Sequence, residues 1–219
     1  MKVVSINIAS VAPISLDGGP KKHKSGIFKM PVSEPVFLDL VGFKGDGVGD
    51  SRIHGGRDKA VCAYCVNHFP YWIAKLKRDI APGAFGENLS LEGSLETDIS
   101  IGDIFEVGSA RIQASQPRQP CHKLNKIFNN QEMACNVQKT GFTGYYFRVI
   151  KTGLVEPGDS IDLIEKDPNE FSIEKANALL RKGGSNIKHM EELISLKALS
   201  EDWREMFEKR LKKIKTKKG

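Results

Sequence analysis

The chain has 219 residues, of which 40% are hydrophobic and 27% are charged, and its formal net charge is +6. This balance is ordinary for a soluble globular protein. No run of about 18 uncharged apolar residues occurs, so the sequence excludes a membrane-spanning helix. The apolar start, MKVVSINIAS, is too short for a signal peptide and lacks a cleavage site. The cytoplasm is therefore the expected location.

The positive charge is concentrated at the end of the chain. The last nine residues, LKKIKTKKG, contain five lysines, and the rest of the chain is near neutral. A basic tail can bind nucleic acid, but such tails are more often solvated termini. A duplex-binding protein would show a broader basic face, so nucleic acid is disfavoured as a partner.

Strand-like runs fill residues 1–166, where short apolar stretches are broken by Gly, Pro, Asp and Asn. In chain order they are MKVVSINIAS, PVFLDLVGF, KAVCAYCV, IFEVGSARIQASQ, YYFRVIKTGLV and DSIDLIEK. Helical spacing appears in two segments, NHFPYWIAKLKRDI and NKIFNNQEMACNVQKTG. Because strands and helices do not alternate regularly, the predicted fold class is mainly β, a barrel or sandwich with a few helices.

The pattern changes near residue 167, after which no strand-like run occurs. The segments SIEKANALLRKG, NIKHMEELISLKAL and SEDWREMFEKRLKKIK predict three helices, with Ser172 and Ser200 as N-caps. We therefore predict two domains, residues 1–166 and a three-helix module with the basic tail at residues 167–219. The apolar stripes of the module indicate a packing face, and its expected role is structural or in interactions.

Four cysteines are present, and in a cytosolic chain they are expected to be free thiols, ligands or nucleophiles. Cys62 and Cys65 have C-x-x-C spacing, but no second pair completes a zinc site. Their segment is strand-like, so both are expected to be small buried residues. Cys135 lies in a predicted helix and is expected in the core.

The fourth cysteine, Cys121, lies in the segment QASQPRQPCHKLN, in a loop that Pro117 and Pro120 stiffen. Arg118 lies three residues before it, and a nearby cation favours a thiolate. This environment is typical of a reactive or metal-ligating cysteine. A single soft thiolate suits a transition metal that other soft ligands already hold. The residues alone leave a nucleophile, a metal ligand and an idle thiol open.

The segment GDSRIHGGRDKAV places several anion-binding groups before a strand. Arg52 offers a bidentate fork for phosphate, and His54 could donate a further hydrogen bond. Gly55 and Gly56 let the backbone approach a ligand and form an anion nest. The alternative is a turn with exposed charges.

Two further polar residues lie in short motifs. Lys29, in GIFKMPV, could point from an extended segment into a cleft, although a surface position is the commoner role of a lysine. Asn88, in FGENLS, could bind a ligand or satisfy its own turn.

Together these motifs resemble those of the MOSC-domain family, and within it the YiiM-type proteins. The resemblance rests on the order and spacing of GIFKMPV, DSRIHGGRDKAV, FGENLS and IGDIFEVGSARIQASQPRQPC, followed by the three helices. It covers essentially the whole chain. It implies a MOSC-type β-barrel domain followed by a small three-helix module.

The resemblance also implies a cofactor and a reaction. MOSC domains handle the molybdenum cofactor, and the family's cysteine, here Cys121, is expected to give a sulfur ligand to molybdenum. YiiM-type proteins are similar to enzymes that reduce N-hydroxylated compounds, such as 6-N-hydroxylaminopurine, and so detoxify base analogues. Electrons are expected from a separate flavoprotein reductase, in agreement with the lack of a nucleotide-binding fingerprint in this chain.

The resemblance assigns roles to the residues already singled out. Cys121, Lys29 and Arg52 are expected to form the catalytic cluster, with Cys121 as the metal ligand. The residues expected to bind the cofactor are Arg52, His54, Gly55, Gly56, Asn88 and Arg118.

Other functions stay open at this point. A molybdenum cofactor or sulfur carrier would use Cys121 without turning over a substrate. A cysteine enzyme without metal would stay active when molybdenum is absent. The sequence also leaves a homodimer open.

Overall fold

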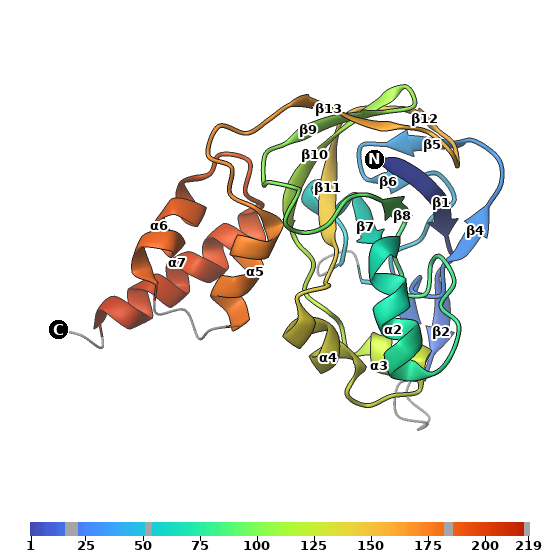
Figure 1. The fold of residues 1–219 in the computed structure, drawn as a ribbon, viewed down its shortest axis with the longest axis horizontal. Coiled ribbons are helices and arrows are strands. Elements are labelled where there is room, and N and C mark those ends of the chain that lie inside the picture. Colours follow the sequence, from blue (N-terminus) through green and yellow to red (C-terminus); the bar gives the residue numbers. More distant parts are fainter. Residues whose placement is uncertain (16–21, 51–53, 182–185, 217–219) are drawn as a thin grey trace.

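The computed structural model describes residues 1–15, 22–50, 54–181 and 186–216, and a large β-sheet forms its centre (Figure 1). The sheet has eight strands in the order β13-β9-β10-β11-β7-β8-β1-β4. All neighbouring strands are antiparallel except β7 and β8, which are parallel. Its strands are β1 (Lys2–Ile8), β4 (Met30–Val32), β7 (Val61–Cys65), β8 (Leu89–Glu92), β9 (Ile104–Val107), β10 (Ala110–Pro117), β11 (Tyr145–Lys151) and β13 (Ile161–Glu165).

Two small sheets accompany the large one. The first has three strands, in the order β12-β5-β6, and the second has two, β2 and β3. Their bounds are β2 (Ala12–Ile14), β3 (His23–Ser25), β5 (Val36–Asp39), β6 (Gly42–Phe43) and β12 (Gly153–Val155). The short strands β2, β3, β4 and β8 lie outside the predicted strand-like runs.

The predicted fold class, mainly β with C-terminal helices, is confirmed, but the word barrel describes the sheet only loosely. The large sheet curls until Lys2 forms an isolated bridge with Ser160, just ahead of β13. Ile161 N donates to Met1 O at 2.9 Å beside this bridge. Within the described residues no ladder of paired strands closes the sheet into a barrel.

Helices lie on two sides of the sheet (Figure 1). Their bounds are α2 (Phe69–Leu76), α3 (Lys123–Phe128), α4 (Met133–Thr140), α5 (Ile173–Arg181), α6 (Ile187–Ser195) and α7 (Glu201–Thr216), with short 3₁₀ turns η1 (Arg57–Lys59) and η2 (Val66–His68). The segment predicted as one helix, residues 125–141, instead contains the end of α3 and the whole of α4. Asn129 has a left-handed φ of 46° and ends α3. None of the described helices is long and apolar enough to cross a membrane.

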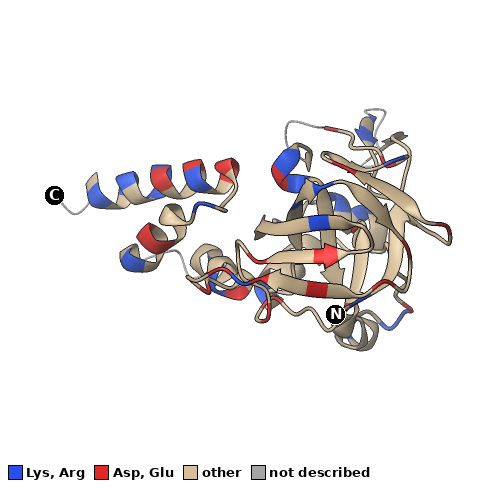
Figure 2. Ribbon diagram, turned by 90° about the horizontal axis from the view of Figure 1, so that it is seen from above, with Lys and Arg blue, Asp and Glu red and all other residues tan. Residues whose placement is uncertain are grey.

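The three C-terminal helices form as the sequence predicts. Ser172 Oγ accepts a hydrogen bond from Lys175 N at 3.0 Å, and Ser200 Oγ accepts one from Trp203 N at 3.4 Å. Each serine therefore satisfies one of the unpaired N–H groups that begin a helix. Acidic residues begin α7 and the charged residues of its last turns are all basic (Figure 2), which matches the helix dipole.

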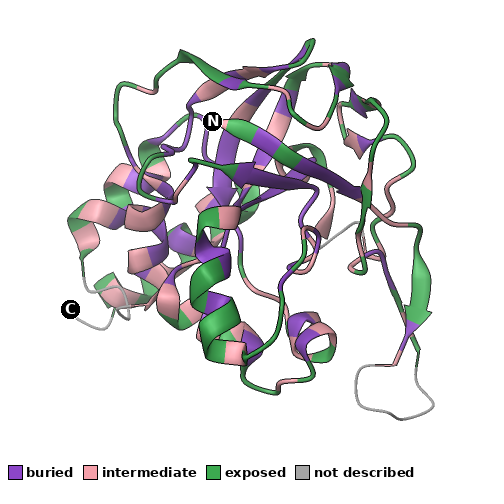
Figure 3. Cartoon of the chain, turned by 45° about the vertical axis from the view of Figure 1, so that its right-hand side comes forward, coloured by how far each residue is buried: buried purple, intermediate pink, exposed green. Residues whose placement is uncertain are grey.

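The main apolar core is continuous between the sheet and the C-terminal helices. Buried residues of the strands, such as Phe105 and Phe147, belong to the same packed cluster as Met190, Trp203 and Phe207 of the helices. Figure 3 shows the buried positions along the inner strands and on the inward faces of the helices. A second aromatic cluster forms between α2, α3 and α4, and contains Tyr64, Phe69, Trp72, Phe85 and Phe128.

Polar contacts fix the start of α7 against the sheet domain. Ser200 N donates to Ser115 O at 3.1 Å, and Glu201 N donates to Asp58 Oδ2 at 3.2 Å. Lys59 of η1 pairs with Asp202. A carboxylate at a helix N-terminus is favourable because of the helix dipole, so Asp58 stabilises this junction.

Candidate functional site

A cavity of about 160 Å³ brings together five residues that the sequence analysis selected. They come from separate parts of the chain: the segment before β4, the stretch before η1, the turn before β8 and the loop after β10. The five are Lys29, His54, Asn88, Arg118 and Cys121.

The remaining predicted site residues are not placed in this cavity. Arg52 lies outside the described residues. Gly55 and Gly56 are described, but neither lines the cavity. Gly56 has a left-handed φ of 97° and open space where a side chain would be, just ahead of η1. The nest expected at these glycines therefore stays a prediction.

Lys29 is held inside the cavity by an ion pair. Its Nζ atom lies 2.5 Å and 2.7 Å from the two carboxylate oxygens of Asp46, and both side chains are buried. Asp46 also accepts hydrogen bonds from Ala9 N and from Asn88 Nδ2. Asn88 Oδ1 in turn accepts one from Cys62 N. Lys29 thus points inward, and Asn88 links it to strand β7.

Arg118 is a buried cation at the end of β10, with only 5% of its surface exposed. Its Nη2 atom donates to Phe85 O at 2.5 Å, and its backbone N donates to Gly144 O at 3.0 Å. The nearby carboxylate of Glu87 is also fully buried. A buried guanidinium with few partners is well suited to bind an anion.

Cys121 lies in the loop between β10 and α3, and its thiol is partly exposed. Its Sγ atom lies 3.7 Å from His122 Nδ1, and its carbonyl accepts a hydrogen bond from Leu124 N as α3 begins. In the part of the chain that the structure describes, His, Cys, Asp and Glu side chains form no cluster of three that could hold a metal ion.

Several residues of the cavity were missed by the sequence analysis, among them Asp46 and two residues of paired strands. Cys62 is a small buried strand residue, as expected, but its side chain lines the cavity. Tyr146 of β11 is its register partner and lines the cavity as well. Paired residues in antiparallel strands point to the same face of a sheet. All five residues of β7 are buried. The strand therefore shows no alternation of buried and exposed residues that would identify the side chains facing the cavity.

Burial keeps both of these side chains neutral. Desolvation raises the pKa of the Cys62 thiol and the pKa of the Tyr146 hydroxyl above their ordinary values. The cavity therefore contains a thiol and a phenol that carry their protons at neutral pH.

His54 is also expected to be neutral. Burial lowers its pKa from 6.5 to about 4, and the positive charges of Lys123, Arg118 and Lys59 act in the same direction. In an NMR titration, the His54 imidazole should become protonated only near pH 4 and stay neutral from pH 5 to 8. A His54→Asn variant identifies its resonance. A midpoint near 6.5 would contradict this prediction.

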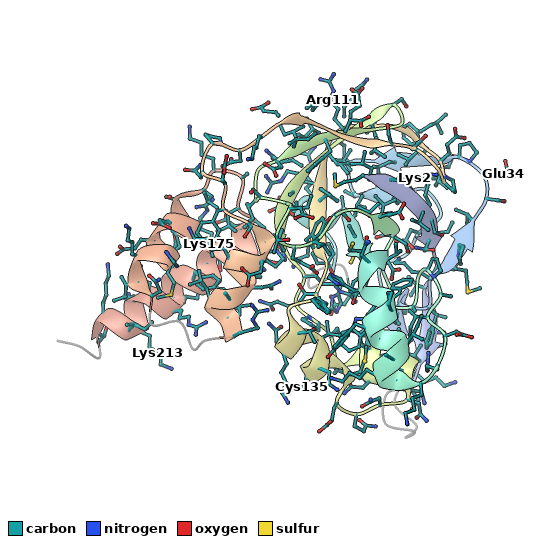
Figure 4. The ribbon with its side chains drawn as sticks, viewed as in Figure 1. Lys2, Glu34, Arg111, Cys135, Lys175 and Lys213 are labelled. Atoms are coloured by element: carbon teal, nitrogen blue, oxygen red, sulfur yellow. The ribbon has the colours of Figure 1, made fainter. Side chains whose placement is uncertain are left out.

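Two cysteines lie away from the cavity. Cys65 is buried in β7, and its thiol contacts Asn67 Oδ1 at 3.2 Å. Cys135 was expected in the core, and this was wrong, because it is exposed on α4 (Figure 4). On this helix Met133 and Val137 are the buried residues, so Cys135 lies on the opposite, solvent-facing side.

The sequence matches two family models, each over a separate part of the chain. The MOSC domain model matches residues 50–162, which is more than half of the chain. The chain belongs to the MOSC-domain family. The second model, the YiiM-like 3-alpha helix domain, matches residues 172–213 of this MOSC protein.

Individual relatives agree with the family models. YflK of Bacillus subtilis (strain 168) is 42% identical over 95% of this MOSC chain and 93% of its own length. The crystal structure of YiiM from Geobacillus stearothermophilus is 37% identical, covers 96% of this chain and 98% of its own, and has a TM-score of 0.83. A protein named reductase from Gibberella moniliformis is 32% identical over 78% of this chain, which spans 31% of that longer protein.

Proposed function

We propose that this MOSC protein is an oxidoreductase that uses the molybdenum cofactor to reduce N-hydroxylated compounds. The substrates would include 6-N-hydroxylaminopurine, so the activity would detoxify base analogues. The electrons would come from a separate flavoprotein reductase. The name of the Gibberella moniliformis relative supports a reductase, and family membership supports the cofactor.

The observation that carries the proposal is a thiol beside a cavity whose lining has more basic than acidic side chains. Four cationic side chains are among the described lining residues, against the single carboxylate of Asp46. The four are Lys29, Lys59, Arg118 and Lys123. The molybdenum cofactor combines a phosphate with a metal that takes soft sulfur ligands, and this set of groups fits both parts.

Three side chains of the cavity, together with Asp46, would take part in the reaction. Cys121 would supply the protein sulfur to the metal, and Arg118 would bind an anionic group of the cofactor. When bound, the cofactor supplies a centre that passes electron pairs to the N–O bond. Lys29 Nζ would donate a proton to the departing oxygen, held in position by Asp46. Overall, two electrons and two protons convert the hydroxylamine to an amine and water.

The proposal is tested by comparing wild-type protein with Cys121→Ser. We expect molybdenum and pterin in the wild type, together with reduction of 6-N-hydroxylaminopurine. In the variant, cofactor content and reductase activity should each fall at least about 100-fold. Mutating even the residues that hydrogen-bond to metal ligands lowers metal affinity or activity about 10–100-fold. The matched control is Cys135→Ser, which changes an exposed thiol away from the cavity and should behave as the wild type.

Two outcomes of this comparison would overturn the proposal. Activity that persists without molybdenum would indicate a metal-free thiol enzyme. Cofactor that binds through Cys121 without any reduction would indicate a carrier.

A further inference from the structure

A second cavity, of about 520 Å³, also borders Cys121. Its volume lies within the range of about 300–1,000 Å³ that is usual for small-molecule sites. One of its walls is the first part of α7, which contributes Asp202, Trp203 and Met206. The C-terminal helices therefore form part of a cavity that reaches the candidate reactive cysteine.

Two buried polar atoms in the walls of this cavity lack a partner. Among the described residues, five buried side-chain N or O atoms make no hydrogen bond, and Gln116 Oε1 and Trp203 Nε1 are two of them. Both residues line the second cavity, with exposed fractions of 3% and 1%. An unmade hydrogen bond on a buried group costs about 1–3 kcal/mol. A ligand that reached these atoms could therefore supply the partner that each of them lacks.

The other walls favour a flat and uncharged ligand. Tyr146 and Trp203 contribute aromatic rings, and Pro120 and Met206 add apolar surface. Aromatic side chains and the adaptable methionine thioether pack well against planar rings. The charged residues Lys59 and Asp202 in these walls pair with each other, so they offset one another.

We propose that the second cavity binds the ring of the substrate, a neutral planar nitrogen heterocycle. One edge of the ring would accept a hydrogen bond from Trp203 Nε1 and donate one to Gln116 Oε1. Because the cavity borders Cys121, an N-hydroxyl substituent on the ring would face the candidate reaction site. This assignment rests on the proposed function, since it places the non-reacting part of the same substrate.

A ligand must displace part of the wall to reach the two covered atoms. Gln119 Nε2 and Met206 Sδ meet at 3.4 Å, and this contact joins the loop after β10 to α7. Gln119 is exposed and Met206 is partly buried, and both have flexible side chains. Both residues line the second cavity, so we infer that the ring would displace this weak contact as it enters.

The test is calorimetric titration of the full chain with adenine, a planar heterocycle that has a donor and an acceptor on one edge. We expect saturable binding with one site per chain. Gln116→Met keeps the shape of the side chain but removes the acceptor, together with the hydrogen bond that Gln116 Nε2 donates to Pro117 O. It should raise the Kd about 5- to 10-fold, the loss expected for one hydrogen bond to the ligand. Gln119→Phe, at an exposed position, should fill the entrance and abolish binding.

A fluorescence measurement locates the bound ring. The chain has two tryptophans, and Trp72 donates to Tyr64 Oη at 2.6 Å in the separate aromatic cluster. In a Trp72→Phe background the remaining emission comes from Trp203. Adenine should quench or shift this emission with the same Kd as in calorimetry.

The result that would overturn the assignment is no binding of adenine to the wild type, or binding that both variants leave unchanged. Circular dichroism melting curves check that the variants are folded. In cofactor-loaded protein, Gln116→Met should raise KM for the hydroxylamino compound and leave kcat nearly unchanged. If adenine binds as expected but the loaded protein reduces nothing, the proposed function fails and the cavity assignment stands.

Discussion

Lys29→Met is expected to lower the free energy of unfolding by about 3–5 kcal/mol, because it leaves the buried carboxylate of Asp46 without its cation. Asp46 keeps its hydrogen bonds to Ala9 N and Asn88 Nδ2, which places the loss toward the lower end of this range. Reductase activity should fall to background, since the proposed proton donor is gone. Urea denaturation and a turnover assay measure the two effects.

A double variant separates the structural and chemical roles of Lys29. Lys29→Met combined with Asp46→Asn removes both charges, and stability should recover in part because no unpaired charge stays buried. Activity should not recover with it. If the double variant regained turnover, Lys29 would serve only to neutralise Asp46. If Lys29→Met alone were as stable as the wild type, the ion pair would not stabilise the fold.

Glu87→Ala is expected to have the second large effect, and it should also lower the free energy of unfolding by about 3–5 kcal/mol. The Glu87 carboxylate is fully buried and accepts hydrogen bonds from Gly83 N, Phe85 N and Ser90 Oγ. Its removal leaves two buried backbone donors unpaired, at about 1–3 kcal/mol each. The turn at Phe85 also carries the carbonyl that holds Arg118, so cofactor content should fall as well.

A milder variant in the same network serves as the control for Glu87. Ser90→Ala removes one of the three donors to the carboxylate and should cost about 1 kcal/mol. Urea denaturation of both variants gives the comparison. Equal costs for Glu87→Ala and Ser90→Ala would contradict the role of Glu87 as the acceptor that organises this turn.

The elements that local sequence patterns control were predicted well. Turn residues separated the strand-like runs, and the N-caps Ser172 and Ser200 began their helices as expected. The single helix predicted for residues 125–141 was wrong because Asn129 adopts a left-handed conformation, which asparagine tolerates but does not require. Whether the curled sheet closes into a barrel depends on pairing between strands that are far apart in the chain. The spacing of apolar residues within one strand carries no information about that pairing.

The candidate site was predictable only in part, for a similar reason. Lys29, His54, Asn88, Arg118 and Cys121 were selected from local motifs, and the structure brings them to one cavity. Their neighbours were selected by no such motif. Asp46 lies between two glycines, a pattern that predicts only a turn, Cys62 lies in a strand that is buried throughout, and Trp203 lies on the packing face of a helix. Each faces its cavity because of tertiary packing, which short sequence windows do not encode.

The continuous core has a consequence for how the protein loses its structure. Along the chain, the described strands all lie before the proposed division at residues 166 and 167, three helices follow it, and the two family models fall on either side of it. The packed apolar cluster, however, runs across this division. Segments that share one core cannot expose it independently, so we expect the sheet and the C-terminal helices to melt in one cooperative transition. The helical module, separate in sequence, would then unfold together with the sheet.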